Sequence, residues 1–185
     1  MDTIFTPFFQ RHQAEWYSRA GTFPVAYLRD RLDKDVQVPG CPFEWLTYWR
    51  TAPSATDPRA FERWQSEQMW IHPHLLAYLL AERRLEIRMK LAGRVIETFP
   101  ILKSHPPLRL LAEGYYVWQT SKKEEPFSLS IGASCDEGEE LLLMVNAVNG
   151  NVFISELHSR KIVGHSSESL PLFLMNAPLA VGWTR

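Results

Sequence analysis

The sequence predicts an α+β protein, in which a central, mostly antiparallel sheet of about five or six strands is combined with helices at the N-terminus, before the sheet and at the C-terminus. Three observations predict this class. Apolar residues recur at helical spacing near both ends, the middle of the chain alternates with a period of two, and the loops between predicted strands are too short for parallel crossovers. A length of 185 residues favours one domain over 1–185, with a helix-rich front over 1–84 and the sheet and closing helix over 85–185.

The first predicted element is a helix over residues 4–19. Gly21 and Pro24 end it, since glycine is typical just after a helix and proline cannot continue one. The side chains whose spacing of three or four residues places them on one face are Phe5, Phe8, Phe9, His12 and Trp16.

The next segment, residues 23–58, is rich in proline and in short aromatic clusters. Within it, residues 43–49 are a strand candidate. Asp57 and Pro58 then have the residue types of an N-cap and a first helical position, which predicts a short helix through Phe61 and Trp64.

A further helix is predicted from Pro73 to about Arg84, with His72 near its N-cap position. The period then changes from helical to two over residues 85–91, which predicts a half-buried strand. A turn at Gly93-Arg94 lets residues 95–102 pair back against it.

Residues 115–119 and 127–131 are further strand candidates, separated by a loop over 122–126, and a second loop follows at 136–140. Asn149-Gly150 lies between two apolar strands and predicts a tight hairpin, because both central residues of that turn need a positive φ. A closing amphipathic helix follows, with Ser166 or Ser167 as its N-cap; its predicted apolar face consists of Leu170, Phe173 and Leu174.

Composition and charge exclude several function classes. The formal net charge of −1 argues against general nucleic-acid binding, which requires a basic face. Two cysteines are too few for a disulfide scaffold. The N-terminus lacks the pattern of a signal peptide, and no apolar run reaches the ~18 residues of a transmembrane helix. We therefore expect a cytoplasmic protein without an integral membrane segment, with both cysteines as thiols.

No motif in the sequence indicates catalysis or a cofactor. His72 and His74 lack the further ligands that a zinc site needs, so no metal site is predicted. Cys41 lies between glycine and proline, and Cys135 precedes an acidic run that would raise its pKa, so neither is favoured as a nucleophile. We expect no enzyme activity and no cofactor.

The aromatic residues are the main candidates for function. Seven Trp, ten Phe and six Tyr are a heavy load, and Trp and Tyr are enriched at interface hot spots. The alternative is that helices cover both sheet faces and all these rings belong to the core. The candidate partner-binding residues are three tryptophans and the acidic loop residues: Trp45, Trp49, Trp118, Glu124, Glu125, Asp136, Glu137, Glu139 and Glu140.

The order of several short patterns resembles the SUKH superfamily, and within it most closely the Syd family. The front of the chain contributes Trp16, Pro24, Cys41-Pro42 and Tyr48-Trp49, and the middle contributes the helix entered through Pro73. The back contributes the strands around Asn149-Gly150, the link Ser159-Arg160-Lys161, and Ser167, Leu170, Phe173 and Leu174 of the final helix.

The resemblance implies an α+β fold and a non-catalytic binding function. Many SUKH members are similar to immunity proteins, which neutralise a cognate bacterial polymorphic toxin by binding and occluding it. Syd itself binds the cytosolic loops of the SecY translocon through an acidic concave surface, which is the alternative partner and would place the protein at the inner face of the membrane. The near-neutral charge favours the toxin, because docking to basic loops favours a strongly acidic partner.

Overall fold

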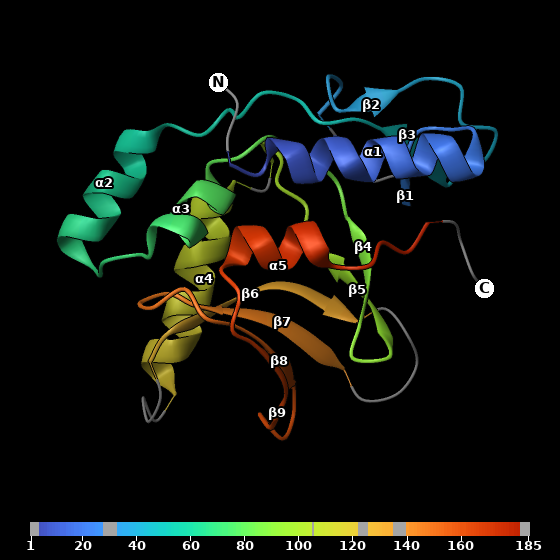
Figure 1. The fold of residues 1–185 in the computed structure, drawn as a ribbon. Helices are drawn as coiled ribbons and strands as arrows, with labels where there is room; N and C mark the ends of the chain where they lie inside the picture. Colours follow the sequence, from blue (N-terminus) through green and yellow to red (C-terminus); the bar gives the residue numbers. More distant parts are fainter. Residues whose placement is uncertain (1–3, 28–32, 105, 122–125, 135–139, 182–185) are drawn as a thin grey trace.

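The computed structural model describes residues 4–27, 33–104, 106–121, 126–134 and 140–181. It combines helices with runs of consecutive antiparallel strands in an α+β arrangement, which confirms the predicted class (Figure 1). The helices are α1 (Thr6–Ala20), α2 (Pro58–Glu67), α3 (Pro73–Leu79), α4 (Pro107–Thr120) and α5 (Leu170–Asn176). None of the helices in these ranges is long and apolar enough to cross a membrane.

Six strands form the main sheet, which is an antiparallel meander in the order β4-β5-β6-β7-β8-β9. Each strand pairs with its neighbour in the chain, so the predicted mostly antiparallel meander is confirmed. The strands are β4 (Arg88–Leu91), β5 (Arg94–Thr98), β6 (Ser128–Ser134), β7 (Leu141–Asn146), β8 (Val152–Glu156) and β9 (Ile162–Ser166).

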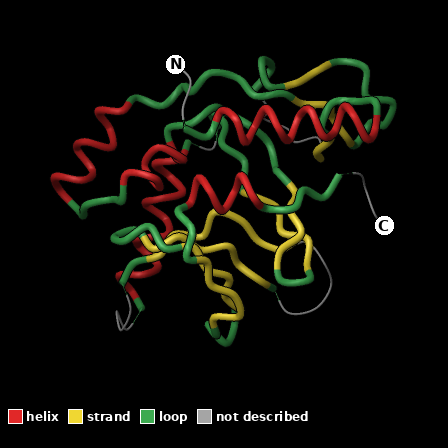
Figure 2. Tube along the Cα trace, viewed as in Figure 1, coloured by secondary structure: helices red, strands yellow, loops and turns green. Residues whose placement is uncertain are grey.

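A second, three-stranded sheet lies beside α1 and has the order β1-β3-β2. Its strands are β1 (Val25–Tyr27), β2 (Gln37–Val38) and β3 (Leu46–Trp49). The central strand β3 covers only the second half of the strand predicted over 43–49. This small sheet and the main sheet appear as separate groups of strands in Figure 2.

The core lies between the main sheet and the helices. In Figure 1, α5 runs between α1 and the strands, and Leu170 and Leu174 of α5 are fully buried. Arg11 of α1 donates hydrogen bonds to the carbonyl oxygens of Met175 and of Ala177, the latter at 2.7 Å. These carbonyls lack helical partners at the end of α5, so Arg11 ties the closing helix to the first one.

The helix starts follow the sequence signals closely. The carboxylate of Asp57 accepts a hydrogen bond from the backbone N–H of Arg59 at 3.0 Å, which confirms Asp57 as the N-cap of α2. His72 caps α3 in the same way, with Nδ1 accepting from the backbone N–H of His74 at 3.2 Å. However, α3 ends at Leu79 and not near Arg84, because Arg83 and Arg84 form single bridges to Ala52 and Ile101.

The strand predicted over residues 115–119 is wrong, since these residues belong to α4. Leu111, Tyr115 and Trp118 recur at helical spacing and pack towards the core. Gly114 permits the close approach of this helix to the sheet, because a Cβ at this position would lie 3.0 Å from the Leu129 side chain.

The tight turn predicted at Asn149-Gly150 is also corrected. Of the two residues only Gly150 has a positive φ, of 75°. The β7–β8 connection is a longer loop, in which the backbone N–H of Asn146 donates to the carbonyl of Asn151 and the Asn146 side chain accepts from Val148 and Asn149. The side chain of Asn146 thus provides the hydrogen-bond acceptor for two backbone N–H groups inside the loop.

The start of the closing helix lies later than predicted. Its N-cap is Ser169, not Ser166 or Ser167, and α5 begins at Leu170. Ser166 instead ends β9, a strand that the sequence did not predict. This segment is short, and its side chains are exposed or half-buried. Its sequence therefore shows no alternation of apolar and polar residues that would mark a strand.

Candidate functional site

Three exposed aromatic side chains lie together at one end of the small sheet, and we call Tyr27, Phe43 and Trp45 the aromatic patch. Their side chains are 52%, 54% and 53% exposed. The ring centroids of Tyr27 and Trp45 are 5.9 Å apart, and those of Phe43 and Trp45 are also 5.9 Å apart. Trp45 is therefore the centre of a continuous aromatic surface that is open to solvent.

The local chain path explains why these rings meet outside the core. A turn closes with a hydrogen bond from the backbone N–H of Leu46 to the carbonyl of Phe43, which leaves Phe43 and Trp45 ahead of β3. The antiparallel register then pairs Leu46 with Tyr27 at the end of β1, so Trp45 comes beside Tyr27. Large exposed aromatic groups of this kind are typical of contact surfaces for other proteins.

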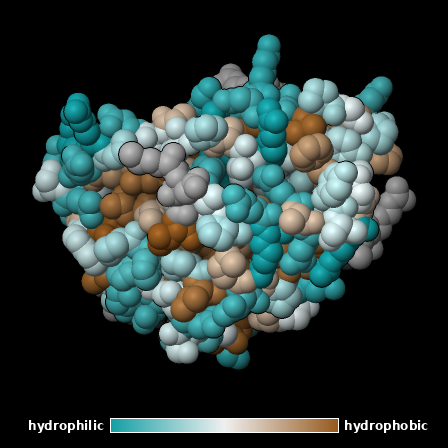
Figure 3. Space-filling view, turned by 45° about the horizontal axis from the view of Figure 1, so that its top comes forward, coloured by the Kyte–Doolittle hydropathy of each residue, from teal (hydrophilic) through white to brown (hydrophobic). Residues whose placement is uncertain are grey.

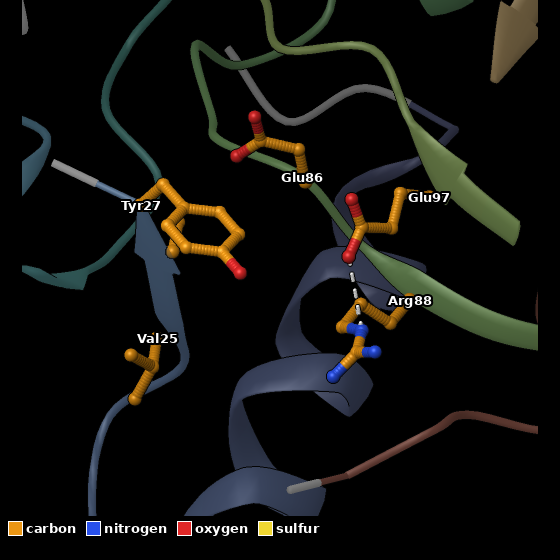
Figure 4. Close-up of a pocket in the computed structure, with 6 residues that line it drawn as sticks. Val25, Tyr27, Glu86, Arg88 and Glu97 are labelled. Atoms are coloured by element: carbon orange, nitrogen blue, oxygen red, sulfur yellow. Dashed lines mark ion pairs between the residues drawn. The ribbon is translucent and has the colours of Figure 1, made fainter. Parts of the chain in front are cut away.

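A narrow crevice with two carboxylates adjoins the patch at Tyr27. Its volume is about 10 Å³, which is the space of about one water molecule. The ring of Tyr27 projects towards Glu86 and Glu97 (Figure 4). The crevice is lined by Val25, Ala26, Tyr27, Glu86, Arg88 and Glu97.

An ion pair joins two of the residues that line this crevice. Arg88 is buried, and its Nε lies 3.1 Å from Oε1 of Glu97 in an ion pair across β4 and β5. This ion pair compensates the charge of Arg88 within the protein. With Glu86 the crevice is lined by two carboxylates and one guanidinium.

Arg83 anchors the small sheet to the rest of the molecule. Its guanidinium donates to Asp33 at 2.7 Å, to both carboxylate oxygens of Asp35, and to the carbonyl of Pro53 at 2.8 Å. The hydrogen bond from Arg83 lowers the pKa of Asp35 to about 2. Because Asp33 and Asp35 precede β2, this network holds the sheet that carries the patch.

A second group of aromatic rings lies on the inner side of the small sheet, and we call His12, Trp16 and Trp49 the inner cluster. The ring of His12 stacks on Trp49 at 5.4 Å and contacts Trp16 edge-on at 6.5 Å. All three side chains are buried. Desolvation, with a smaller contribution from the charge of Arg11, lowers the pKa of His12 to about 3, so this imidazole is neutral at pH 7.

The three tryptophans that the sequence predicted as contact residues differ in their exposure to solvent. Trp45 is exposed, as a contact residue must be, and its role stays a prediction. Trp49 is fully buried, so it is a core residue and not the contact residue that the sequence predicted. Trp118 is half-buried on α4, where its ring stacks on Tyr115 at 5.5 Å and contacts Phe127 at 5.9 Å, so most of it packs against the protein itself.

Of the predicted acidic residues, the structure describes Glu140. It is exposed, and its backbone carbonyl accepts a hydrogen bond from Leu157 at 2.8 Å. The others lie outside the described residues: Glu124, Glu125, Asp136, Glu137 and Glu139.

Tyr27 and Phe43 are the patch residues that the sequence-based list missed. The strand that ends at Tyr27 has three residues, too few to show a period of two. Phe43 was placed inside a strand, whereas it belongs to the turn before β3. The only signal was the density of aromatic residues around Trp45.

A second hollow is a cleft of about 550 Å³ near the starts of α2 and α4. Figure 3 shows hydrophobic surface on the side of the molecule where α2 lies. Each basic residue that lines the cleft has a carboxylate nearby. Arg83 pairs with Asp33 and Asp35, Nζ of Lys103 lies 3.7 Å from Oδ2 of Asp35, and Arg109 pairs with Glu113. This balance gives the cleft no distinct preference for a charged ligand.

The remaining candidates for metal binding or catalysis are two histidines and two cysteines. The rings of His72 and His74 lie 5.0 Å apart, next to Trp70, and His72 is occupied as the cap of α3. Within the described ranges, no three His, Cys, Asp or Glu side chains gather as a metal site would require. Cys41 is a half-buried free thiol, and Cys135 lies outside the described residues.

No protein-family model matches the chain, and no curated protein matches its sequence.

Proposed function

We propose that this chain is a non-catalytic protein-binding module, an immunity protein that neutralises a cognate bacterial toxin by binding to it. The observation that carries the proposal is the aromatic patch. Three neighbouring rings that are each more than half exposed are costly to leave in water, and they offer a large contact area with little side-chain entropy to lose. Such rings fill pockets on a partner protein.

The crevice beside the patch supports a partner with basic residues. The crevice is lined by two carboxylates beside Tyr27, so an arginine or lysine of the toxin that reaches Tyr27 meets an aromatic ring with carboxylates next to it. Toxins that act on nucleic acids carry such basic residues around their active sites, since they must hold phosphates.

Inhibition by this surface needs no chemical step. A rigid patch seated at the mouth of the toxin's active site excludes the substrate by its volume. Arg83 and its two aspartates keep the small sheet in place, so little ordering remains to be done when the partner binds.

Co-expression with a candidate toxin domain from a neighbouring gene tests the proposal. The unchanged chain should protect cells and co-purify with the toxin domain, and Trp45→Ala should lose protection. Trp70→Ala is the matched control, because Trp70 is 52% exposed but lies outside the patch. No protection and no complex with the unchanged chain would overturn the proposal.

The same experiment separates the alternative partner. Binding to SecY-containing membranes that is lost at high salt, without any toxin complex, would replace the immunity function by the Syd-like one.

A further inference from the structure

The Asn149-Gly150 pair in the loop between β7 and β8 can undergo a chemical modification that needs no enzyme. Because glycine has no side chain beside its nitrogen, that backbone nitrogen can attack the amide carbon of the preceding asparagine. A bond forms between the nitrogen of Gly150 and Cγ of Asn149, a succinimide ring closes, and the amide nitrogen leaves as ammonia with the proton of the glycine nitrogen. Water then opens either carbonyl of the ring, which gives aspartate or isoaspartate at position 149.

The structure exposes the asparagine but engages the glycine nitrogen. Asn149 is exposed, and its Oδ1 accepts a hydrogen bond from the backbone N–H of Asn151 at 2.9 Å. The backbone N–H of Gly150 donates to the carbonyl of Asn146 at 2.9 Å. A nitrogen that keeps this hydrogen bond can neither lose its proton nor turn towards the amide carbon. The attack on Asn149 therefore requires this bond to break.

The ring of His72 holds the same glycine from the side of α3. A Cβ built on Gly150 would lie 2.5 Å from Nδ1 of His72, so the imidazole fills the space beside this backbone. The backbone N–H of His72 donates to the carbonyl of Ala147 at 2.7 Å, which ties the start of α3 to the loop. Gly150 is buried, and its backbone has no room to rotate while the ring stays in place.

We propose that Asn149 is a spontaneous deamidation site that the folded loop keeps closed and that becomes reactive when the loop opens away from α3. Opening of one loop costs less free energy than unfolding of the whole chain, so the reaction proceeds while the rest of the molecule is folded. Isoaspartate lengthens the main chain by a methylene group. The modified loop therefore does not restore the contact between Gly150 and His72, and the modification is a permanent record of opening.

This site is independent of the aromatic patch. The loop joins two strands of the main sheet, whereas the patch lies at one end of the small sheet. Deamidation at Asn149 is expected whether or not the chain binds a toxin, so failure of one proposal leaves the other unaffected.

Mass spectrometry of the peptide that contains residue 149 tests the proposal after incubation at mildly alkaline pH. The conversion of amide to acid should be slower by about tenfold or more in the folded chain than in the same chain in urea, because only the open loop reacts. Aspartyl and isoaspartyl peptides should both form, since the succinimide opens at either carbonyl. Asn149→Gln should abolish the conversion in this peptide.

His72→Ser opens the loop selectively, because serine is a good N-cap for α3 but leaves the space beside Gly150 empty. The folded variant should deamidate about tenfold faster than the unchanged chain. Its Gly150 amide should exchange hydrogen faster while Val145 in β7 exchanges as before, which separates loop opening from loss of global stability. His158→Ser, at an exposed histidine in another turn, is the control.

Three results would overturn the proposal. They are equal conversion in the folded chain and in urea, no conversion in urea, and equal rates for His72→Ser and His158→Ser.

Discussion

The aromatic patch and the inner cluster lie four residues apart in the chain, at Trp45 and Trp49, and have opposite surroundings. Trp49 is fully buried and stacks on His12, whereas Trp45 is 53% exposed and contacts two rings that are themselves exposed. The same residue type thus serves packing at one position and is available for contact at the other. The two positions differ because α1 packs over Trp49, whereas the aromatic patch stays exposed to solvent.

The largest expected effect is on stability and comes from Trp49→Ala. Removing this buried ring opens a cavity and should lower the free energy of unfolding by about 3–5 kcal/mol. Trp45→Ala should lower it by about 1 kcal/mol or less, since the ring is exposed. Urea denaturation of both variants measures the difference, and equal losses would show that the two clusters are not distinct.

Arg83→Met should have the next largest effect. It leaves the buried carboxylate of Asp33 without its cation, and breaking such a pair should cost about 3 kcal/mol. The small sheet should loosen first, because Asp33 and Asp35 precede β2. Hydrogen exchange checks this: faster exchange confined to the three-stranded sheet is expected, with Arg109→Met, an exposed pair, as control. Unchanged exchange there would contradict the role of Arg83 as an anchor.

The inner cluster should make stability depend on pH. His12 keeps a pKa of about 3 in the folded chain, whereas in the unfolded chain it takes up a proton below its ordinary value of 6.5. Stability should therefore fall as the pH drops below 6.5, with a contribution of about 1.4 kcal/mol per pH unit from this residue, and above 6.5 His12 should have no effect.

His12→Phe keeps a ring at this position and removes the titration. Its free energy of unfolding, measured by urea denaturation from pH 7 to pH 4, should fall less steeply than that of the unchanged chain. His158→Gln, at an exposed histidine, is the control. Parallel pH profiles for His12→Phe and the unchanged chain would contradict a buried neutral imidazole.

Much of the fold could be predicted because its signals are local. Asp57-Pro58 and His72-Pro73 mark helix starts through a cap and a fixed φ, and both starts were placed correctly. The meander followed from short loops and from the period of two. Residues 115–119 were wrongly predicted as a strand because consecutive aromatic residues favour strands. The spacing of Leu111, Tyr115 and Trp118 is that of a helix.

The candidate site was predicted only in part, because it depends on contacts distant in sequence. Strands β1 and β2 have three and two residues, too few for a period to appear, and they exist through pairing with β3. Trp45 and Trp49 differ in burial because α1 packs on one of them. No local pattern in residues 43–49 carries that information.

The most direct test of the central claim is the dissociation constant of the purified complex with the toxin domain, measured by calorimetry for Trp45→Ala and Trp70→Ala side by side. If the aromatic patch is the contact surface, Trp45→Ala should weaken binding about 30-fold, or about 2 kcal/mol, and Trp70→Ala should bind like the unchanged chain. Equal dissociation constants for the two variants would show that the partner binds elsewhere and that the aromatic patch is not the functional site.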